Sequence, residues 1–330
     1  MTVSSDQSPL SALAQTPPHE PGARHRRLVE AARAHGPVAV AVIHPCDARS
    51  LTGALAARDA GLIRPVLVGP PDRIAAAATA AGLSLEGLEI VGTPHSHASA
   101  ETAVALAREG KVQALMKGAL HTDEVLGAVI DKATGLRTER RITHVFVLDV
   151  PQYSKPLFIT DAAINIEPDL ETKRDIIQNA IDLAHALGLQ EPKVAVLSAV
   201  ETVTPAIRST VDAAALCKMA DRGQITGGLV DGPLAFDNAV SVEAARMKGI
   251  TSSVAGHADI LVAPDLVSGN MIAKQLVYLA GAQSAGLALG ATVPIILTSR
   301  SDDVEARVAS SALAVLFIAE AKRRKGKTPA

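Results

Sequence analysis

The chain has 330 residues, of which 48% are hydrophobic, and a formal net charge of −2 at pH 7. A chain of this length is too long to fold around one ordinary hydrophobic core, and it suits two domains of roughly 150 residues each. A near-neutral charge, 2% aromatic residues and no tryptophan argue against a nucleic-acid-binding protein, which needs a basic surface or aromatic platforms for the bases.

The first 22 residues are rich in Ser, Thr, Gln and Pro, and we expect a mobile tail before a helix that contains Arg26 to Arg33. They lack the charged start and apolar centre of a signal peptide, and no apolar run is long enough to span a bilayer, so we expect a cytoplasmic protein. Cys46 and Cys217 lie far apart and form no CxxC pair, as is typical of a reducing compartment. We expect both to be small core residues.

Short β-branched runs then alternate with Ala-rich segments of helical spacing. The runs predict strands over Val38–Ile43, Val66–Val68, Leu88–Val91 and Ala114–Met116. This alternation is typical of a parallel sheet covered by helices. The pattern changes near Thr143, where predicted strands over Val145–Val150 and Leu157–Thr160 are joined by a loop too short for a crossover. The short loop favours an antiparallel hairpin.

A second alternating series follows the hairpin. It contains a helix from Asp169 to about Leu187, strands over Val194–Leu197, Gly228–Val230, Ile260–Val262, Ala288–Gly290 and Val293–Leu297, and a last helix over Val304–Lys322. We therefore predict an α/β fold of two domains, with parallel or mixed sheets flanked by helices and a cleft between the domains. The first domain is expected to comprise residues 1–142 and 293–330, and the second residues 143–292.

The segment from Pro294 to Asp303 combines an apolar strand with hydroxyl, guanidinium and carboxylate groups directly after it. Reactive side chains gather at the carboxyl ends of strands, and a helix that begins near Asp302 turns its free N–H groups toward the same place. This arrangement predicts a phosphate site that includes Ser299 and Arg300. The structural alternative is that Ser301 or Asp302 only caps the helix and Arg300 forms a surface ion pair.

The string Leu297-Thr298-Ser299-Arg300-x-Asp302 resembles the strand-end signature of the phosphate acetyltransferase and phosphate butyryltransferase family. Other segments resemble that family in the right order, over about residues 25 to 320: Met116-Lys117-Gly118-x-x-x-Thr122, Gly135-Leu136-Arg137-Thr138, Thr143-His144-Val145-Phe146, Asp161-Ala162-Ala163-Ile164-Asn165, Asp231 to Asp237, and Gly269-Asn270-Met271. They look closer to the butyryl-type and enoyl-hydratase-fused members than to the acetyl-specific members, whose loop after Ser-Arg is usually longer than the short loop here. The short loop leaves open whether Asp302 or Asp303 takes the place of the catalytic carboxylate.

The resemblance implies a fold like that of isocitrate and isopropylmalate dehydrogenases, and a homodimer. It implies the reversible conversion of acyl-CoA and inorganic phosphate to acyl phosphate and coenzyme A, with coenzyme A as a substrate and with no metal, other cofactor or covalent intermediate. Asp302 would take the proton of the CoA thiol, Arg300 would stabilise the thiolate or neutralise the phosphate, and Ser299 would donate to the developing oxyanion.

Further candidates for substrate binding are Lys117, Arg137, Asp161, Asn165, Asp231, Asn270 and Asp303. Lys117 offers an ammonium to a phosphate, although exposed Lys next to Gly is common. Arg137, with Arg140 and Arg141, suits the phosphates of coenzyme A, and the alternative is a solvated face. For Asp161 with Asn165, and for Asp231, the alternative is that the side chains only form turns.

Other functional classes fit the sequence less well. His95 and His97 have neither carboxylates nor cysteines nearby in the chain, which is poor geometry for zinc. No GxGxxG follows the first strand, and GxxxxGK[ST] and HExxH motifs are missing. The remaining alternatives are a metal-dependent hydroxyacid dehydrogenase of the same fold, which needs converging carboxylates and a nicotinamide site, and a regulatory module that binds coenzyme A or acyl phosphate. The complete Ser299, Arg300 and Asp302 set argues against a module without activity.

Overall fold

The computed structural model describes residues 22–298 and 302–327. The described chain divides into two compact units: unit I comprises residues 28–140, 285–298 and 302–327, and unit II comprises residues 22–27 and 141–284. The predicted N-terminal tail, Ser299 and Arg300 lie outside the described residues. The predicted division into a first domain of residues 1–142 and 293–330 and a second domain of residues 143–292 stays a prediction.

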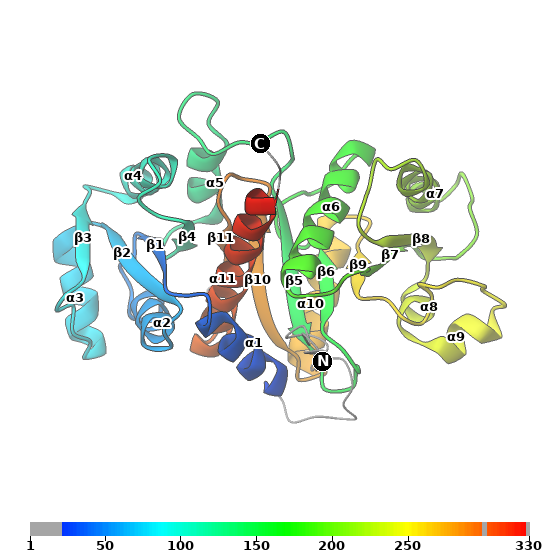
Figure 1. The fold of residues 1–330 in the computed structure, drawn as a ribbon, viewed down its shortest axis with the longest axis horizontal. Helices are drawn as coiled ribbons and strands as arrows, with labels where there is room; N and C mark the ends of the chain where they lie inside the picture. The colour runs from blue at the N-terminus through cyan, green and yellow to red at the C-terminus, as the bar shows by residue number, and fades with distance from the viewer. Residues whose placement is uncertain (1–21, 299–301, 328–330) are drawn as a thin grey trace, which may run out of the picture. The chain divides into compact units, whose positions relative to one another are not determined.

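Unit I contains a mixed sheet (Figure 1). Its strands are β1 (Val38–Ile43), β2 (Ile63–Gly69), β3 (Glu89–Gly92), β4 (Ala114–Lys117), β10 (Gln283–Leu289) and β11 (Ile295–Ile296), in the order β3-β2-β1-β4-β11-β10. Neighbours pair in parallel except β10 with β11. All residues of β1 are buried, as expected for a central parallel strand. The predicted strands are confirmed, although β10 begins earlier and β11 is shorter than predicted.

The chain reverses its direction of travel across this sheet at β1. It adds β2 and then β3 on one side of β1, and β4 and β11 on the other side. Such a switch point between β1 and β4 is where open α/β sheets bind ligands, at the carboxyl ends of the strands. The flanking helices are α1 (Ala23–Arg33), α2 (Ala48–Asp59), α3 (Pro71–Ala81), α4 (Ser96–Arg108), α5 (Thr122–Ile130) and α11 (Val304–Lys327); α2 packs against α11, and α4 against α5.

Unit II contains a second mixed arrangement of strands in the order β5-β6-β9-β7-β8. The strands are β5 (Thr143–Asp149), β6 (Leu157–Thr160), β7 (Lys193–Leu197), β8 (Leu229–Leu234) and β9 (Ile260–Val262). The predicted antiparallel hairpin of β5 and β6 is confirmed, and the other pairs are parallel. The helices are α6 (Leu170–Ala186), α7 (Arg208–Asp221), α8 (Phe236–Val240), α9 (Val242–Met247) and α10 (Leu266–Leu279). Leu148, Ile159 and Leu261 lie in its hydrophobic core.

The expectation for Asp231 was wrong in its local structure. The sequence predicts a strand that ends at Val230, with a turn as one alternative for Asp231, but Asp231, Gly232 and Pro233 all lie within β8. Asp231 pairs with Ala195, and the register shifts between Ala195 and Leu197. β8 is an edge strand, and an irregular edge tolerates Gly and Pro because one side needs no ladder hydrogen bonds.

Two further observations bear on the predictions from composition. Within the described part of the chain, no helix is long and apolar enough to cross a membrane. Cys46 and Cys217 are both half-buried thiols rather than full core residues. Burial raises the pKa of both thiols, to about 12 for Cys217, so neither is poised to act as a thiolate.

Candidate active site

The carboxyl ends of β1, β4 and β11 lie next to one another in unit I. Ile43 at the end of β1 pairs with Lys117 at the end of β4, and Ile296 at the end of β11 pairs with Met116. Lys117 is buried, and its Nζ donates to the carbonyl oxygen of Leu120 at 3.2 Å. The positive charge of Lys117 therefore lies at the switch point. This is the end of a strand, where the sequence places the family-like Lys117-Gly118 segment.

Gly118 has a packing role at the same place. Its N–H donates to the carbonyl oxygen of Ile43 at 2.9 Å. A Cβ at residue 118 would lie 2.4 Å from that oxygen and 2.9 Å from the carbonyl oxygen of His44. Only glycine therefore fits where β4 leaves the sheet against the end of β1.

The turn between β11 and α11 carries the predicted catalytic residues. Ser299 and Arg300 lie outside the described residues, whereas Asp302 and Asp303 are described. α11 begins at Val304, as predicted for the last helix, and Oδ1 of Asp303 accepts a 2.8 Å hydrogen bond from the N–H of Ala306. Asp303 is thus the N-terminal cap of α11, whereas the structural alternative had predicted that Ser301 or Asp302 caps this helix. Asp302, one residue before the cap, is half-buried.

Arg307 is a charged residue at this turn that the sequence analysis missed. It lies in the first turns of α11 and is 5% exposed. Its side chain crosses α2 at Gly53, where a Cβ would lie 2.2 Å from its Cδ. Burial lowers the pKa of Arg307, and the negative charges of Asp302 and Asp47 act in the opposite direction. The available signal in the sequence was a lone arginine within the apolar run of the last helix.

His44 also escaped the sequence analysis. It follows β1 with a positive φ of 52° and is buried. Its Nδ1 lies 3.2 Å from Oγ of Ser99, and its Nε2 lies 3.3 Å from Nη1 of Arg73. Burial lowers the pKa of His44, and the nearby charge of Arg73 adds to this effect. With both ring nitrogens engaged, His44 ties the loop after β1 to Ser99 and Arg73.

Three of the predicted substrate-binding residues come together in unit II. The Asp161 carboxylate accepts hydrogen bonds from the N–H of Ala163 at 2.9 Å and from Nδ2 of Asn165 at 2.6 Å. Nδ2 of Asn270 donates to the carbonyl oxygen of Ala162 at 3.0 Å. Asp161 is 1% exposed, and its contacts are those of a turn-forming residue, which was the alternative to substrate binding. The same contacts join the family-like segment after β6 and the one in α10 into one polar cluster. Asp231, in β8, lies apart from this cluster in the strand order.

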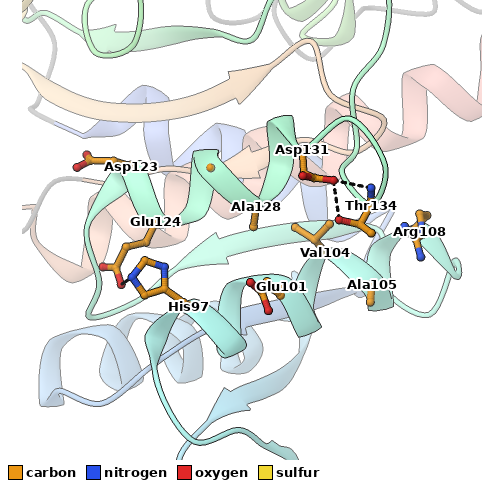
Figure 2. Close-up of a pocket in the computed structure, with 11 residues that line it drawn as sticks. His97, Glu101, Val104, Ala105, Arg108, Asp123, Glu124, Ala128, Asp131 and Thr134 are labelled. Carbon is orange, nitrogen blue, oxygen red and sulfur yellow. Dashed lines mark hydrogen bonds and ion pairs between the residues drawn. The ribbon is translucent and has the colours of Figure 1, made fainter.

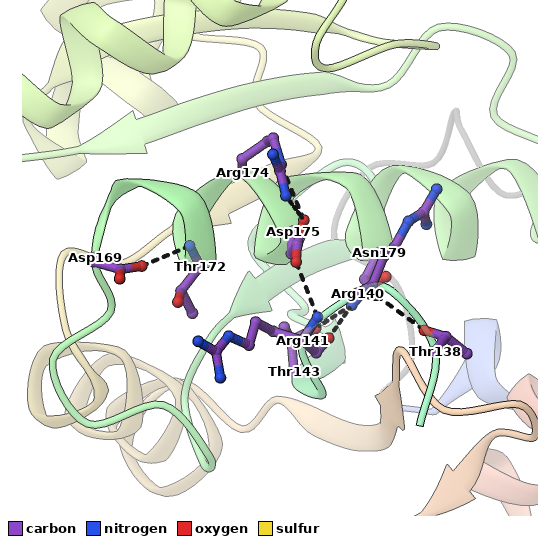
Figure 3. Close-up of polar contacts among 9 residues, drawn as sticks. All are labelled: Thr138, Arg140, Arg141, Thr143, Asp169, Thr172, Arg174, Asp175 and Asn179. Atoms are coloured by element: carbon purple, nitrogen blue, oxygen red, sulfur yellow. Dashed lines mark hydrogen bonds and ion pairs between the residues drawn. The ribbon is translucent and has the colours of Figure 1, made fainter. Parts of the chain in front are cut away.

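The basic segment before β5 has a fixed backbone and exposed side chains. The N–H of Arg141 donates to Oδ2 of Asp175 at 2.9 Å, and Nδ2 of Asn179 donates to the carbonyl oxygen of Arg141 at 3.1 Å (Figure 3). The side chains of Arg137, Arg140 and Arg141 are exposed. A fixed backbone with exposed guanidinium groups suits both an anionic ligand and a solvated face.

A cavity of about 570 Å³ lies between α4 and α5 (Figure 2). It contains His97, whose Nε2 lies 3.6 Å from Oε1 of Glu124, and Asp131, which accepts a hydrogen bond from Thr134. None of the predicted site residues that the structure describes lines this cavity. The neighbouring His95 caps α4 by accepting from the N–H of Ala98. The expectation that no carboxylate lies near these histidines is wrong, because Glu124 lies beside His97 and belongs to a segment distant in the chain.

Unit I thus carries the buried Lys117 at the end of β4, and unit II carries the polar cluster at Asp161. Comparison with known proteins names the class of protein to which the chain belongs. The family model described as "Phosphate acetyl/butaryl transferase" matches residues 96–315. The chain belongs to this family and is an acyltransferase, as the resemblance predicted.

Individual relatives agree with this assignment. The chain is 60% identical over 296 residues to a phosphate acetyltransferase of Rhizobium meliloti, covering 90% of this chain and 94% of the relative. It is 43% identical over 279 residues to a phosphate butyryltransferase of Clostridium acetobutylicum, covering 84% and 92%. A crystal structure of a branched-chain phosphotransacylase from Enterococcus faecalis superposes with a TM-score of 0.75 at 29% identity, covering 86% and 99%. The acetyltransferase shares more of the sequence than this butyryltransferase does, and the predicted likeness to butyryl-type members in the short loop stays a prediction.

Proposed function

We propose that this chain converts acyl-CoA and inorganic phosphate reversibly to acyl phosphate and coenzyme A, with acetyl as the preferred acyl group. The observation that carries the acetyl preference is the 60% identity to the R. meliloti phosphate acetyltransferase over 90% of this chain. A metal-dependent dehydrogenase or a regulatory module finds no comparable support among these relatives.

In the direction that consumes acyl phosphate, the CoA sulfur attacks the acyl carbon, the bond from that carbon to the phosphate oxygen breaks, and phosphate leaves. Asp302 takes the thiol proton, and Arg300 neutralises the thiolate or the phosphate. Ser299 donates to the oxyanion, a contribution of about 3 kcal/mol for one donor. The cap contact of Asp303 supports Asp302 as the base, since the Asp303 carboxylate is engaged by the helix.

The substrate-binding roles follow from charge and position. The buried Lys117 at the end of β4 supports a phosphate contact, and the exposed Arg137 supports a contact with the phosphates of coenzyme A. The contact of Asn165 with Asp161 and the contact of Asn270 with the backbone of Ala162 support a polar substrate-binding surface on unit II, and Asp231 and Asp303 are the weakest candidates. No metal is needed for this chemistry. In residues 22–298 and 302–327, no three His, Cys, Asp or Glu side chains come together as metal ligands.

The family resemblance further suggests a homodimer, a cytoplasmic location, and a cleft like that of the isocitrate-type dehydrogenases, all of which stay predictions. α10 supports a self-associating surface, because Met271, Tyr278 and Leu279 are 65%, 69% and 81% exposed. Light scattering of the purified chain tests the dimer, and Met271→Glu is expected to shift it toward monomer.

The test of the function is an assay of the purified chain with acetyl-, propionyl- and butyryl-CoA side by side in phosphate, with release of free thiol and formation of acyl phosphate both measured. We expect acetyl-CoA to give the highest kcat/KM, since each methylene in a pocket changes the free energy by about 1 to 3 kcal/mol. Parallel reactions with NAD, Mn²⁺ and a hydroxyacid test the dehydrogenase alternative. Reduction of NAD without thiol release would overturn the proposal.

A further inference from the structure

Thr298 is a buried hydroxyl at the end of the strand that leads to the catalytic turn. It lies two residues past β11 and is 4% exposed. Its Oγ1 has no hydrogen-bond partner in the described part of the chain, residues 22–298 and 302–327. A buried hydroxyl left without a partner costs about 1 to 3 kcal/mol, so native structures keep few of them without a functional reason.

Other buried hydroxyls of unit I are bonded. Oγ of Ser310 donates to the carbonyl oxygen of Ala306 at 2.7 Å, and Oγ of Ser311 to that of Arg307 at 2.8 Å. Oγ1 of Thr93 lies 2.7 Å from Oγ of Ser99. The local fold thus satisfies its hydroxyls where no ligand is expected, and Thr298 differs from them in both position and bonding.

The position of Thr298 indicates what it binds. β11 runs parallel to β4, with Ile296 paired to Met116, so Thr298 follows the end of β11 next to the place where β4 ends in Lys117 and Gly118. β4 is also one side of the switch point with β1. The buried ammonium of Lys117 makes this edge favourable for an anion.

We propose that the Thr298 hydroxyl donates a hydrogen bond to an oxygen of the substrate's phosphate, or of the phosphoryl group of acyl phosphate. The inference rests on the proposed function and adds a substrate-contacting residue to it. Phosphate presents several charged acceptors, whereas a thioester presents one neutral carbonyl oxygen and an acyl methyl group none. Hydrogen bonds to ionised acceptors are roughly twice as strong as neutral ones. Phosphate is therefore the ligand that best compensates the free-energy cost of burying the hydroxyl.

The test compares Thr298→Val, which keeps the shape and removes the hydroxyl, with Thr298→Ser, which keeps the hydroxyl. Thr93→Val is the matched control, since it removes a buried threonine hydroxyl that is already bonded. Melting temperatures are measured with and without inorganic phosphate, and KM is measured for phosphate and for acetyl-CoA.

We expect Thr298→Val without ligand to melt at or above the wild-type temperature, because no hydrogen bond to residues 22–298 or 302–327 is lost. Its stabilisation by phosphate should shrink, and its KM for phosphate should rise on the order of tenfold, with KM for acetyl-CoA unchanged and Thr298→Ser close to wild type. Thr93→Val should melt earlier and keep the wild-type response to phosphate.

The phosphate-binding readout needs no turnover, so the two proposals fail separately. If the wild type turns over and Thr298→Val responds to phosphate as the wild type does, the inference is overturned and the function stands. If phosphate stabilises the wild type but not Thr298→Val, and no acyl transfer occurs, the proposed function is overturned, while the contact of the Thr298 hydroxyl with phosphate stands. A wild type without any response to phosphate, or a Thr298→Val protein that melts early with an unchanged KM, also overturns the inference.

Discussion

The N–H of Ala306 donates a 2.8 Å hydrogen bond to Oδ1 of Asp303, and this contact closes the N-terminus of α11. Asp302, one residue earlier, is half-buried, and its charge acts on the buried Arg307. The two adjacent carboxylates therefore have different surroundings. Substitution of Asp302 should mainly change turnover, and substitution of Asp303 should mainly change stability.

Asp302→Asn should lower turnover by about 10²- to 10⁴-fold, because it removes a proton acceptor and keeps the shape. It should also lower the melting temperature, because the negative charge of Asp302 acts on the buried Arg307. Asp303→Ala should cost about 0.5 to 2 kcal/mol of stability and little activity, because it removes a cap. Asp169→Ala, which removes the cap of α6, is the matched control. Turnover that collapses in the Asp303 variant and stays near normal in the Asp302 variant would show that Asp303 is the base.

Arg300→Lys should fold normally and lose much of the rate, since a guanidinium binds phosphate in two places and an ammonium acts as a point charge. Steady-state kinetics together with circular dichroism check this. A folded Arg300→Ala protein with wild-type kinetics would remove Arg300 from the mechanism.

Gly118→Ala should destabilise the protein strongly, because the added Cβ would lie 2.4 Å from the carbonyl oxygen of Ile43. Gly127→Ala is the matched control: Gly127 lies inside α5, where a Cβ meets nothing within 4 Å. Alanine there should stabilise by about 0.5 to 1 kcal/mol. Chemical denaturation measures both, and equal stability of the two variants would contradict the packing described for the end of β4.

Prolonged dialysis against EDTA should leave the rate unchanged, because the proposed chemistry uses only side chains and substrates. The rate is measured before dialysis, after it, and after addition of Mg²⁺ or Mn²⁺. Loss of turnover on dialysis with recovery on metal addition would favour the dehydrogenase-like alternative.

Hydrogen bonds from Arg323 and Arg324 lower the pKa of Glu320 on α11 to about 2. Because the folded pKa lies below the ordinary value of 4.5, the stabilisation is present above about pH 4.5 and is lost as the pH falls toward 2. Glu320→Gln should therefore melt earlier than the wild type at pH 7, and the difference should shrink below pH 4.5. A difference that stays constant or grows down to pH 3 would contradict this role.

Local patterns in the sequence were enough for much of the fold. The strand over Val38–Ile43, the antiparallel hairpin and the helix that follows Asp169 were predicted nearly as observed, because side-chain periodicity and loop length are properties of neighbouring residues. The family-like strings were also contiguous, so the acyltransferase class and the strand-end position of Lys117 could be read from them.

Only the tertiary structure decided which partners these residues have. Arg307 lies against Gly53, Asn270 donates to the backbone at Ala162, and the Thr298 hydroxyl is left without a bond in the described chain. The sequence places Asp231 before a glycine and a proline, which predicts a turn, yet the edge position of β8 lets the strand continue. Contacts between residues far apart in the chain depend on how strands and helices pack, and packing leaves no local periodicity by which such pairs could be recognised.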